Sequence, residues 1–272
     1  MSNFFQRTIT GALFIILVIG SILWNHYAFS LVFLIFTILG VTEFYAIISK
    51  TGSKPFGFSG IVISALLFLI CSYIAISNSN FYFILIILPL LFIDFIIELF
   101  RNHKTPFQNI AFTYIGIFYV ALPISLLNFL SNPGFEHEKY SKGILIGFFL
   151  LIWSNDTFAY LIGKKFGKHK LFERISPKKT WEGSIGGLIF CLITSYILSI
   201  FVKDLSIIQW LGMSVIVVIF GTLGDLTESM LKRSLDIKDS GNILPGHGGI
   251  LDRFDAVLLA APFVFIYLLL VL

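Results

Sequence analysis

The polar stretch SMLKRSLDIKDSGNILPGHGGILDRFD, residues 229–255, separates two apolar runs at 206–224 and 252–272. Four basic and four acidic residues lie between positions 232 and 255, and the central sequence PGHGG excludes a continuous helix or strand there. Carboxylate oxygens suit magnesium, and cations with free backbone N–H groups suit phosphates. Charged loops between membrane helices are also often only solvated, so composition alone leaves both interpretations open.

The rest of the chain is built of similar apolar runs. Hydrophobic residues make up 57% and charged residues 12%, whereas charge averages about a quarter in soluble proteins. Runs of about 20 apolar residues span a bilayer, and only helices of that length satisfy their backbone groups in lipid outside a closed barrel. The sequence therefore predicts an all-α polytopic integral membrane protein with about nine transmembrane helices. The expected spans are 8–24, 28–49, 59–76, 81–100, 109–130, 143–162, 184–202, 206–224 and 252–272.

The positions of Lys and Arg predict the orientation of these spans. With the N-terminus inside, alternating loops leave only Lys139, Lys142 and Lys203 of the 19 basic residues outside. Basic excess marks the cytoplasmic face, so the N-terminus is expected in the cytoplasm. The net charge of +4 is explained by this topology, and no nucleic-acid partner is expected. Cys71 and Cys191 lie in apolar runs and form neither a disulfide framework nor a zinc cluster.

We expect two regions. Residues 1–130 would form five spans without a motif, and residues 131–272 a catalytic membrane region with cytoplasmic loops at 163–183 and 225–254. The compact single chain favours a bacterial cytoplasmic membrane.

Four carboxylates are expected on the cytoplasmic side and are the candidate metal ligands: Asp156, Asp225, Asp252 and Asp255. Asp252 and Asp255 share one helix face, although both could simply complement a helix N-terminus. Asp225 follows two glycines that allow another backbone to approach, and an aspartate so near hydrocarbon is usually functional. Asp156 could equally be a ligand or the partner of a buried lysine.

The glycines of the PGHGG turn allow several N–H groups to point into one concavity, a nest for anionic oxygens. Neighbouring cations would complete a cradle for a triphosphate, and His247 could bind a phosphate or hold the turn. Ser176 and Pro177 are interpreted as the N-cap and first residue of a helix, which would place Lys178 and Lys179 in its first turn.

A longer pattern is more specific. Between residues 229 and 255 the chain reads S-x-L-K-R, then four residues, then K-D-x-G, and finally L-P-x-H-G-G-I-x-D-R-x-D. Two upstream segments belong to the same pattern, DTFAYLIG at 156–163 and SPKKTWEG at 176–183. This pattern resembles the signature of the phosphatidate cytidylyltransferases, also called CDP-diglyceride synthases, with no departure from it. The resemblance covers roughly the C-terminal half of the chain.

The resemblance implies transfer of CMP from CTP to phosphatidate, giving CDP-diacylglycerol and pyrophosphate. It also implies a need for Mg²⁺, as one or two divalent ions with room for a different second cation, and a homodimer in the membrane. On this interpretation the active site faces the cytoplasm, and Asp225 and Asp252, assisted by Asp255 and with Asp156 as a further candidate, hold the metal. The expected catalytic residues are Asp225, Asp252, Asp255, Lys232, Arg233 and His247. The expected substrate-binding residues are Lys178, Lys179, Lys238, Asp239, Gly246, Gly248, Gly249 and Arg253.

A transporter and other membrane enzymes of lipid metabolism are the alternative functions. Intramembrane carboxylates also mark ion paths in transporters, but here they gather at one face and no inverted repeat or pair of broken helices is apparent. The DGxxAR-type motif of CDP-alcohol phosphotransferases and the NDxxD motif of membrane prenyltransferases are absent. A lipid kinase that uses CTP would need similar phosphate chemistry and stays open.

Overall fold

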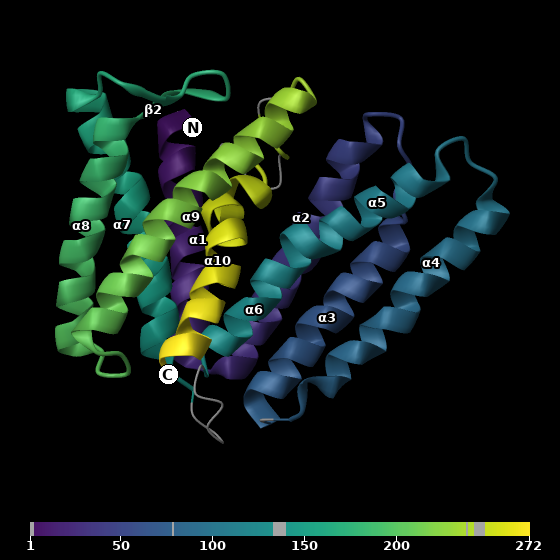
Figure 1. Ribbon diagram of the computed structural model, residues 1–272, viewed down its shortest axis with the longest axis horizontal. Coiled ribbons are helices and arrows are strands. Elements are labelled where there is room, and N and C mark those ends of the chain that lie inside the picture. The colour runs from purple at the N-terminus through teal and green to yellow at the C-terminus, as the bar shows by residue number, and fades with distance from the viewer. Residues whose placement is uncertain (1–2, 78, 133–139, 238, 242–247) are drawn as a thin grey trace. The chain divides into compact units, whose positions relative to one another are not determined.

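The computed structural model describes residues 3–77, 79–132, 140–237, 239–241 and 248–272, with side chains from Thr8 onward. Helices dominate these residues, as the apolar runs predict (Figure 1). The chain divides into two compact units, Met1–Tyr140 with Ile237–Phe254 and Ser141–Asp236 with Asp255–Leu272. The polar stretch is therefore shared: part of it packs with N-terminal helices that the sequence had suggested carry no motif.

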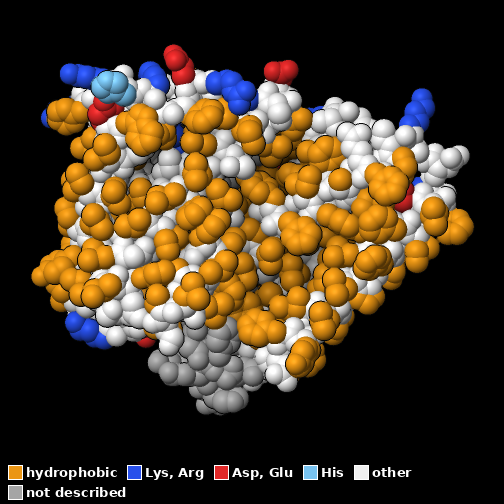
Figure 2. Space-filling view, in the orientation of Figure 1, with side chains coloured by type: hydrophobic (Ala, Val, Ile, Leu, Met, Phe, Trp, Pro, Cys, Tyr) orange, Lys and Arg blue, Asp and Glu red, His pale blue; other side chains and the backbone are white. Residues whose placement is uncertain are grey.

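All nine expected spans coincide with helices. Eight helices among the described residues are long and apolar enough to cross a membrane, and a ninth apolar segment, Thr8–Trp24, is shorter. Figure 2 shows apolar side chains covering the visible face, with charged side chains concentrated near helix ends. Leu99, Phe100 and Ile208 are each at least 77% exposed, which suits contact with lipid rather than water. The protein is thus an integral membrane protein of the all-α class.

The first unit is a helical assembly joined by short loops. Its elements are α1 (Asn3–Trp24), α2 (His26–Ser49), α3 (Gly57–Ser77), the 3₁₀ helix η1 (Phe81–Ile86), α4 (Ile87–Arg101), α5 (Pro106–Gly116), the π-helical turn η2 (Ile117–Ala121) and α6 (Leu122–Leu130). Arg101 Nη2 donates to the carbonyl of Lys54 at 3.4 Å, so the loops after α2 and α4 meet at one end of this unit. This is the arrangement that the alternating topology requires of them.

The second unit contains the longest helices. Its elements are α7 (Lys142–Phe166), β1 (Lys170–Phe172), β2 (Ser176–Thr180), α8 (Trp181–Phe201), α9 (Ile207–Ser234) and most of α10 (Leu251–Val271). The helix α9 continues well past residue 224, so residues 225–234, which we expected in a loop, are helical. The apolar run predicts only where the membrane-spanning part of α9 ends. Beyond it the helix is stabilised by the i,i+4 pair of Glu228 and Lys232, and by Lys232 and Arg233, whose charges complement the helix dipole at the C-terminus.

The expected helix start at Ser176 is wrong. Residues Ser176–Thr180 form strand β2, which pairs antiparallel with β1. The N-cap is Thr180 instead: its backbone is extended and its hydroxyl accepts from Gly183 N at 3.2 Å. Pro177 lacks an N–H, but a two-stranded ribbon has unpaired edges that tolerate it. Lys178 and Lys179 consequently lie on a β-hairpin rather than in a helical turn.

The core of the first unit is organised around Tyr45 of α2. Its ring is 4% exposed, and its hydroxyl donates to the carbonyl of Thr113 at 2.7 Å. The ring lies against two glycines, Gly60 of α3 and Gly116 of α5. A Cβ at Gly60 would lie 2.6 Å from Tyr45 Cζ and 2.7 Å from Cε2, closer than real contacts allow. The absence of a side chain there lets one tyrosine join three helices.

This packing predicts that Gly60→Ala destabilises the protein. The new methyl must displace a rigid ring that is also hydrogen-bonded, and such overpacking costs about 1–3 kcal/mol. The matched control is Gly20→Ala in α1, where a Cβ would meet nothing within 4 Å. Thermal unfolding of the detergent-solubilised variants should give a lower Tm for Gly60→Ala only. An unchanged Tm for Gly60→Ala would contradict this role of the ring.

Candidate active site

In the second unit, α9 and α10 approach closely at Gly224. A Cβ at this residue would clash with the carbonyl oxygen of Asp255 and would lie 3.1 Å from the Cα of Ala256. Only glycine permits this contact between backbones. The sequence predicted that the glycines before Asp225 allow such an approach, and this is confirmed for Gly224. The contact brings the adjacent Asp225 to the part of α10 that carries Asp255.

Carboxylates gather where these helices meet. Asp225, Asp156 and Glu228 all lie close enough to Asp255 for their charges to act on it. We call these four residues the acid cluster: Asp156, Asp225, Glu228 and Asp255. Asp255 also accepts a hydrogen bond from Ala256 N at 2.8 Å. Residues of α7, α9 and α10 thus bring like charges together, an arrangement that is unfavourable unless cations or donors are supplied.

Two lysines supply positive charge to the acid cluster. Lys179 of β2 forms an ion pair with Asp225 Oδ2, and the two side chains are 27% and 22% exposed. Lys232 pairs with Glu228 Oε2 at 2.5 Å, where the glutamate side chain is only 2% exposed. The β-hairpin therefore delivers a cation to the end of α9 from a position 46 residues earlier in the chain. Both lysines were expected site residues, and both lie at the acid cluster.

Asp252 lies in a different setting, in the first unit. Its Oδ2 accepts from Gly249 N at 2.8 Å, Ser240 N at 3.0 Å and Ser240 Oγ at 2.8 Å. The hydroxyl of Ser240 also contacts Glu43 Oε1 of α2. Asp252 thus joins the first turn of α10 to the preceding loop by hydrogen bonds. This agrees with the simpler interpretation that Asp252 complements a helix N-terminus.

Glu43 holds the same segment from the other side. Its Oε2 accepts from Ile250 N at 2.8 Å, and its Oε1 accepts from Leu251 N at 3.3 Å. Glu43 is 5% exposed, so these donors stabilise a charge that is buried in an apolar helix. Glu43 is not among the predicted site residues. Its position inside an apolar run was the available signal, because a charge there is costly to bury.

The glycines at the start of α10 fit around these carboxylates. Gly248 has a φ of +83°, as expected of a glycine turn, and a Cβ there would clash with Asp252. A Cβ at Gly249 would clash with Glu43. The N–H groups of Gly249, Ile250 and Leu251 donate to Asp252 and Glu43. These particular donors therefore satisfy protein carboxylates in this structure rather than pointing into an open nest.

The carboxylates of the described residues can be compared with the ligands that magnesium prefers. In the described part of the chain, no three His, Cys, Asp or Glu side chains converge closely enough to form a ready-made metal site. Magnesium, however, is usually held by one or two carboxylates, with waters and substrate phosphates completing its shell. The acid cluster offers hard oxygens of that kind, with Asp225 and Asp255 adjacent at the Gly224 contact. The residues present therefore fit magnesium bound together with a phosphate substrate.

The remaining predicted residues are either exposed or outside the described part of the chain. Lys178, Arg233, Asp239 and Arg253 are exposed. Lys238, Gly246 and His247 lie outside the described residues. Glu228 was not among the predicted site residues, although it is buried in the acid cluster.

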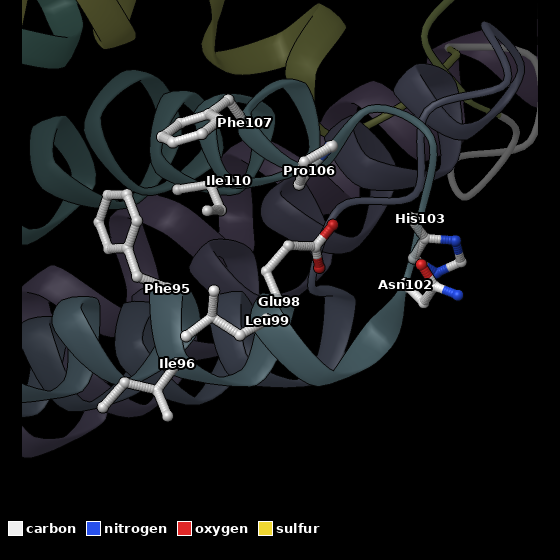
Figure 3. Close-up of a pocket in the computed structure, with 9 residues that line it drawn as sticks. All are labelled: Phe95, Ile96, Glu98, Leu99, Asn102, His103, Pro106, Phe107 and Ile110. Carbon is white, nitrogen blue, oxygen red and sulfur yellow. The ribbon is translucent and has the colours of Figure 1, made fainter.

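A pocket of about 400 Å³ lies elsewhere in the first unit, between α4 and α5. Figure 3 shows the carboxylate of Glu98 directed into it among apolar side chains that include Phe95 and Phe107. Glu98 accepts from Asn109 Nδ2 at 2.8 Å and pairs with Arg101 at 3.3 Å. None of the predicted site residues lines this pocket, and Glu98 acts there as the structural partner of a basic loop.

Comparisons with known proteins agree with the motif. The model of the cytidylyltransferase family matches residues 5–271. The phosphatidate cytidylyltransferase of Staphylococcus saprophyticus is 42% identical over 170 residues, 62% of either chain, and that of Staphylococcus aureus is 41% identical over the same length. The phosphatidate cytidylyltransferase of Bacillus subtilis is 39% identical over 163 residues, 60% of this chain and 59% of its own.

The aligned part of the chain spans about three fifths of the length of these curated relatives. The family model, in contrast, extends over nearly all of the sequence, including both units and all nine apolar segments. Together with the membrane helices and the acid cluster, this match identifies the family: the chain belongs to the cytidylyltransferase family.

Proposed function

We propose that this protein is a nucleotidyltransferase that transfers CMP from CTP to phosphatidate, giving CDP-diacylglycerol and pyrophosphate for phospholipid biosynthesis. The observation that carries the proposal is the acid cluster with its lysines, held at the Gly224 contact in a membrane protein of this family. The relatives named above are phosphatidate cytidylyltransferases of bacteria, which supports a bacterial cytoplasmic membrane. The site would face the cytoplasm, where CTP is available.

The reaction forms one bond and breaks one. An oxygen of the phosphatidate phosphate attacks the α-phosphorus of CTP, and the bond from that phosphorus to the oxygen bridging to the β-phosphate breaks. The electron pair leaves with pyrophosphate. The nucleophile is a phosphate monoester that is anionic at neutral pH, so no base has to activate it. The difficulty is to bring two polyanions together and to stabilise the charge on the leaving group.

The residues of the acid cluster and its lysines suit that task. Lys179 and Lys232 supply cations at the ends of a β-strand and a helix, where they can neutralise phosphate oxygens. Asp225 orients Lys179 through their ion pair. When bound by Asp225 and Asp255, magnesium would neutralise charge on the triphosphate and on the leaving pyrophosphate. Arg233, which is exposed on α9 of the same unit, would meet the phosphates from the solvent side.

Asp252 and Glu43 have a positioning role in this proposal. Their hydrogen bonds fix the loop that begins α10, and Asp255 follows Asp252 by three residues on that helix. These hydrogen bonds hold the first turn of α10, which carries Asp252, in one conformation. The homodimer and the absence of a nucleic-acid partner stay predictions. A lipid kinase that uses CTP would give a product of different mass, so mass spectrometry of the product distinguishes it from the proposed enzyme.

Asp225→Asn should abolish incorporation of labelled CTP into lipid by the detergent-solubilised protein. The substitution keeps the shape of the side chain but removes the charge that attracts Lys179 and a metal ion. Loss of such an electrostatic contribution lowers kcat by about 10²-fold or more. Asp204→Asn is the matched control, because Asp204 is exposed in the loop before α9. Near-normal turnover by folded Asp225→Asn would remove this aspartate from the site.

Glu43→Gln should reduce both stability and turnover. The amide has one accepting oxygen in place of two, so a buried N–H at the start of α10 loses its partner, at a cost of about 1–3 kcal/mol. A lower Tm and slower CTP-dependent lipid synthesis are expected. Glu173→Gln, in the exposed turn between β1 and β2, makes the same chemical change and should behave as wild type. If both variants matched wild type, Glu43 would have no positioning role.

A further inference from the structure

A second cavity, of about 530 Å³, lies in the second unit between α8, α9 and the β-hairpin. Its lining is apolar and comes from the hairpin and from facing turns of both helices. The lining includes Phe172, Trp181, Ile185, Thr222, Leu223 and Leu226. We call this cavity the hairpin groove. Trp181, Ile185 and Leu223 are 44–55% exposed, so the groove is open to the surroundings of the helices rather than enclosed.

One end of the hairpin groove adjoins the acid cluster. Thr222 and Leu226 line the groove, and both flank Asp225 on α9. The ion pair of Asp225 with Lys179 also ties this end of the groove to the hairpin. An apolar molecule lying in the groove would therefore have its end next to the groups that are proposed to bind phosphate.

The hairpin segment that contributes to the groove is strongly basic. Seven basic residues lie between 164 and 179, and Glu173 is the only acidic residue in that segment. The side chains of Lys170, Arg174 and Lys178 are exposed on the hairpin. An apolar groove lined in part by a basic hairpin complements an anionic lipid. The acyl chain would contact the apolar lining, and the phosphate would contact the basic side chains.

We propose that the hairpin groove binds an acyl chain of phosphatidate and so delivers the lipid phosphate to Lys179 and Asp225. This inference rests on the proposed function and adds the route by which the lipid substrate is bound. Binding along the groove fixes the phosphate with energy from parts of the lipid that do not react, which favours attack on a bound nucleotide. Leu223 and Ile185 then determine how much acyl chain is accommodated.

The test is steady-state kinetics with phosphatidates of long and short acyl chains. Leu223→Trp and Ile185→Trp fill the groove and should raise KM for the long-chain lipid about 10-fold or more, since even one misfit methylene in an apolar pocket has an effect of that order. KM for CTP should not change, and the short-chain lipid should be much less affected. Ile193→Trp is the control: Ile193 is 47% exposed on α8 but does not line the groove.

Failure of the two proposals can be told apart. A folded wild-type protein that makes no lipid product from CTP and phosphatidate would refute the proposed function. Normal wild-type turnover with an unchanged KM for long-chain phosphatidate in both tryptophan variants would refute the groove alone.

A direct measurement guards against misfolded variants. Wild-type protein is irradiated with phosphatidate that carries a photoreactive group in one acyl chain, and the labelled peptides are identified by mass spectrometry. Labels on groove residues of α8 and α9, reduced by unlabelled phosphatidate but not by phosphatidylcholine, support the proposal. Equal competition by phosphatidylcholine would indicate bulk lipid, and labels only on residues outside the groove would indicate another binding surface; either result overturns the proposal.

Discussion

The structure depends on the partners that surround carboxylates at the ends of apolar helices. A charge close to hydrocarbon is stable only when hydrogen-bond donors or cations replace the water that it has lost. Glu43 meets this requirement with two backbone N–H groups, Asp252 with donors from Ser240 and Gly249, and Asp225 with Lys179. Each of these contacts also fixes a loop, a hairpin or a helix start within its own unit.

The acid cluster and the start of α10 satisfy this requirement differently. At the start of α10 the carboxylates are saturated by donors of the protein, which suits a structural clamp. In the acid cluster, several carboxylates act on one another and their lysines lie on flexible stems that can turn toward a phosphate. A group of like charges with mobile cations is suited to taking up a metal ion and an anionic substrate together. In the proposed function, the acid cluster therefore carries the chemistry of nucleotidyl transfer, and the clamp fixes the first turn of α10.

Much of this arrangement could be predicted from the sequence. The nine apolar runs gave the helices, and Gly224 indicated a close backbone contact beside Asp225. The hairpin at 170–180 was not predicted because Ser-Pro is typical of a helix start. The actual N-cap of α8, Thr180, follows only once β2 is known to pair with β1. The end of α9 was placed too early because apolarity marks the membrane boundary, not the end of hydrogen bonding. Glu43 could not be assigned, since its donors come from residues about 200 positions later in the chain.

Magnetic resonance of Mn²⁺, used in place of Mg²⁺ and bound to the purified protein with CTP, tests directly whether the acid cluster holds metal and nucleotide together. We expect phosphorus coupling from the nucleotide to the bound ion, and loss of that bound species in Asp225→Asn and Asp255→Asn but not in Asp204→Asn. If both acid-cluster variants retained the ion and its coupling to CTP as in wild type, the acid cluster would not be the place where metal and nucleotide meet.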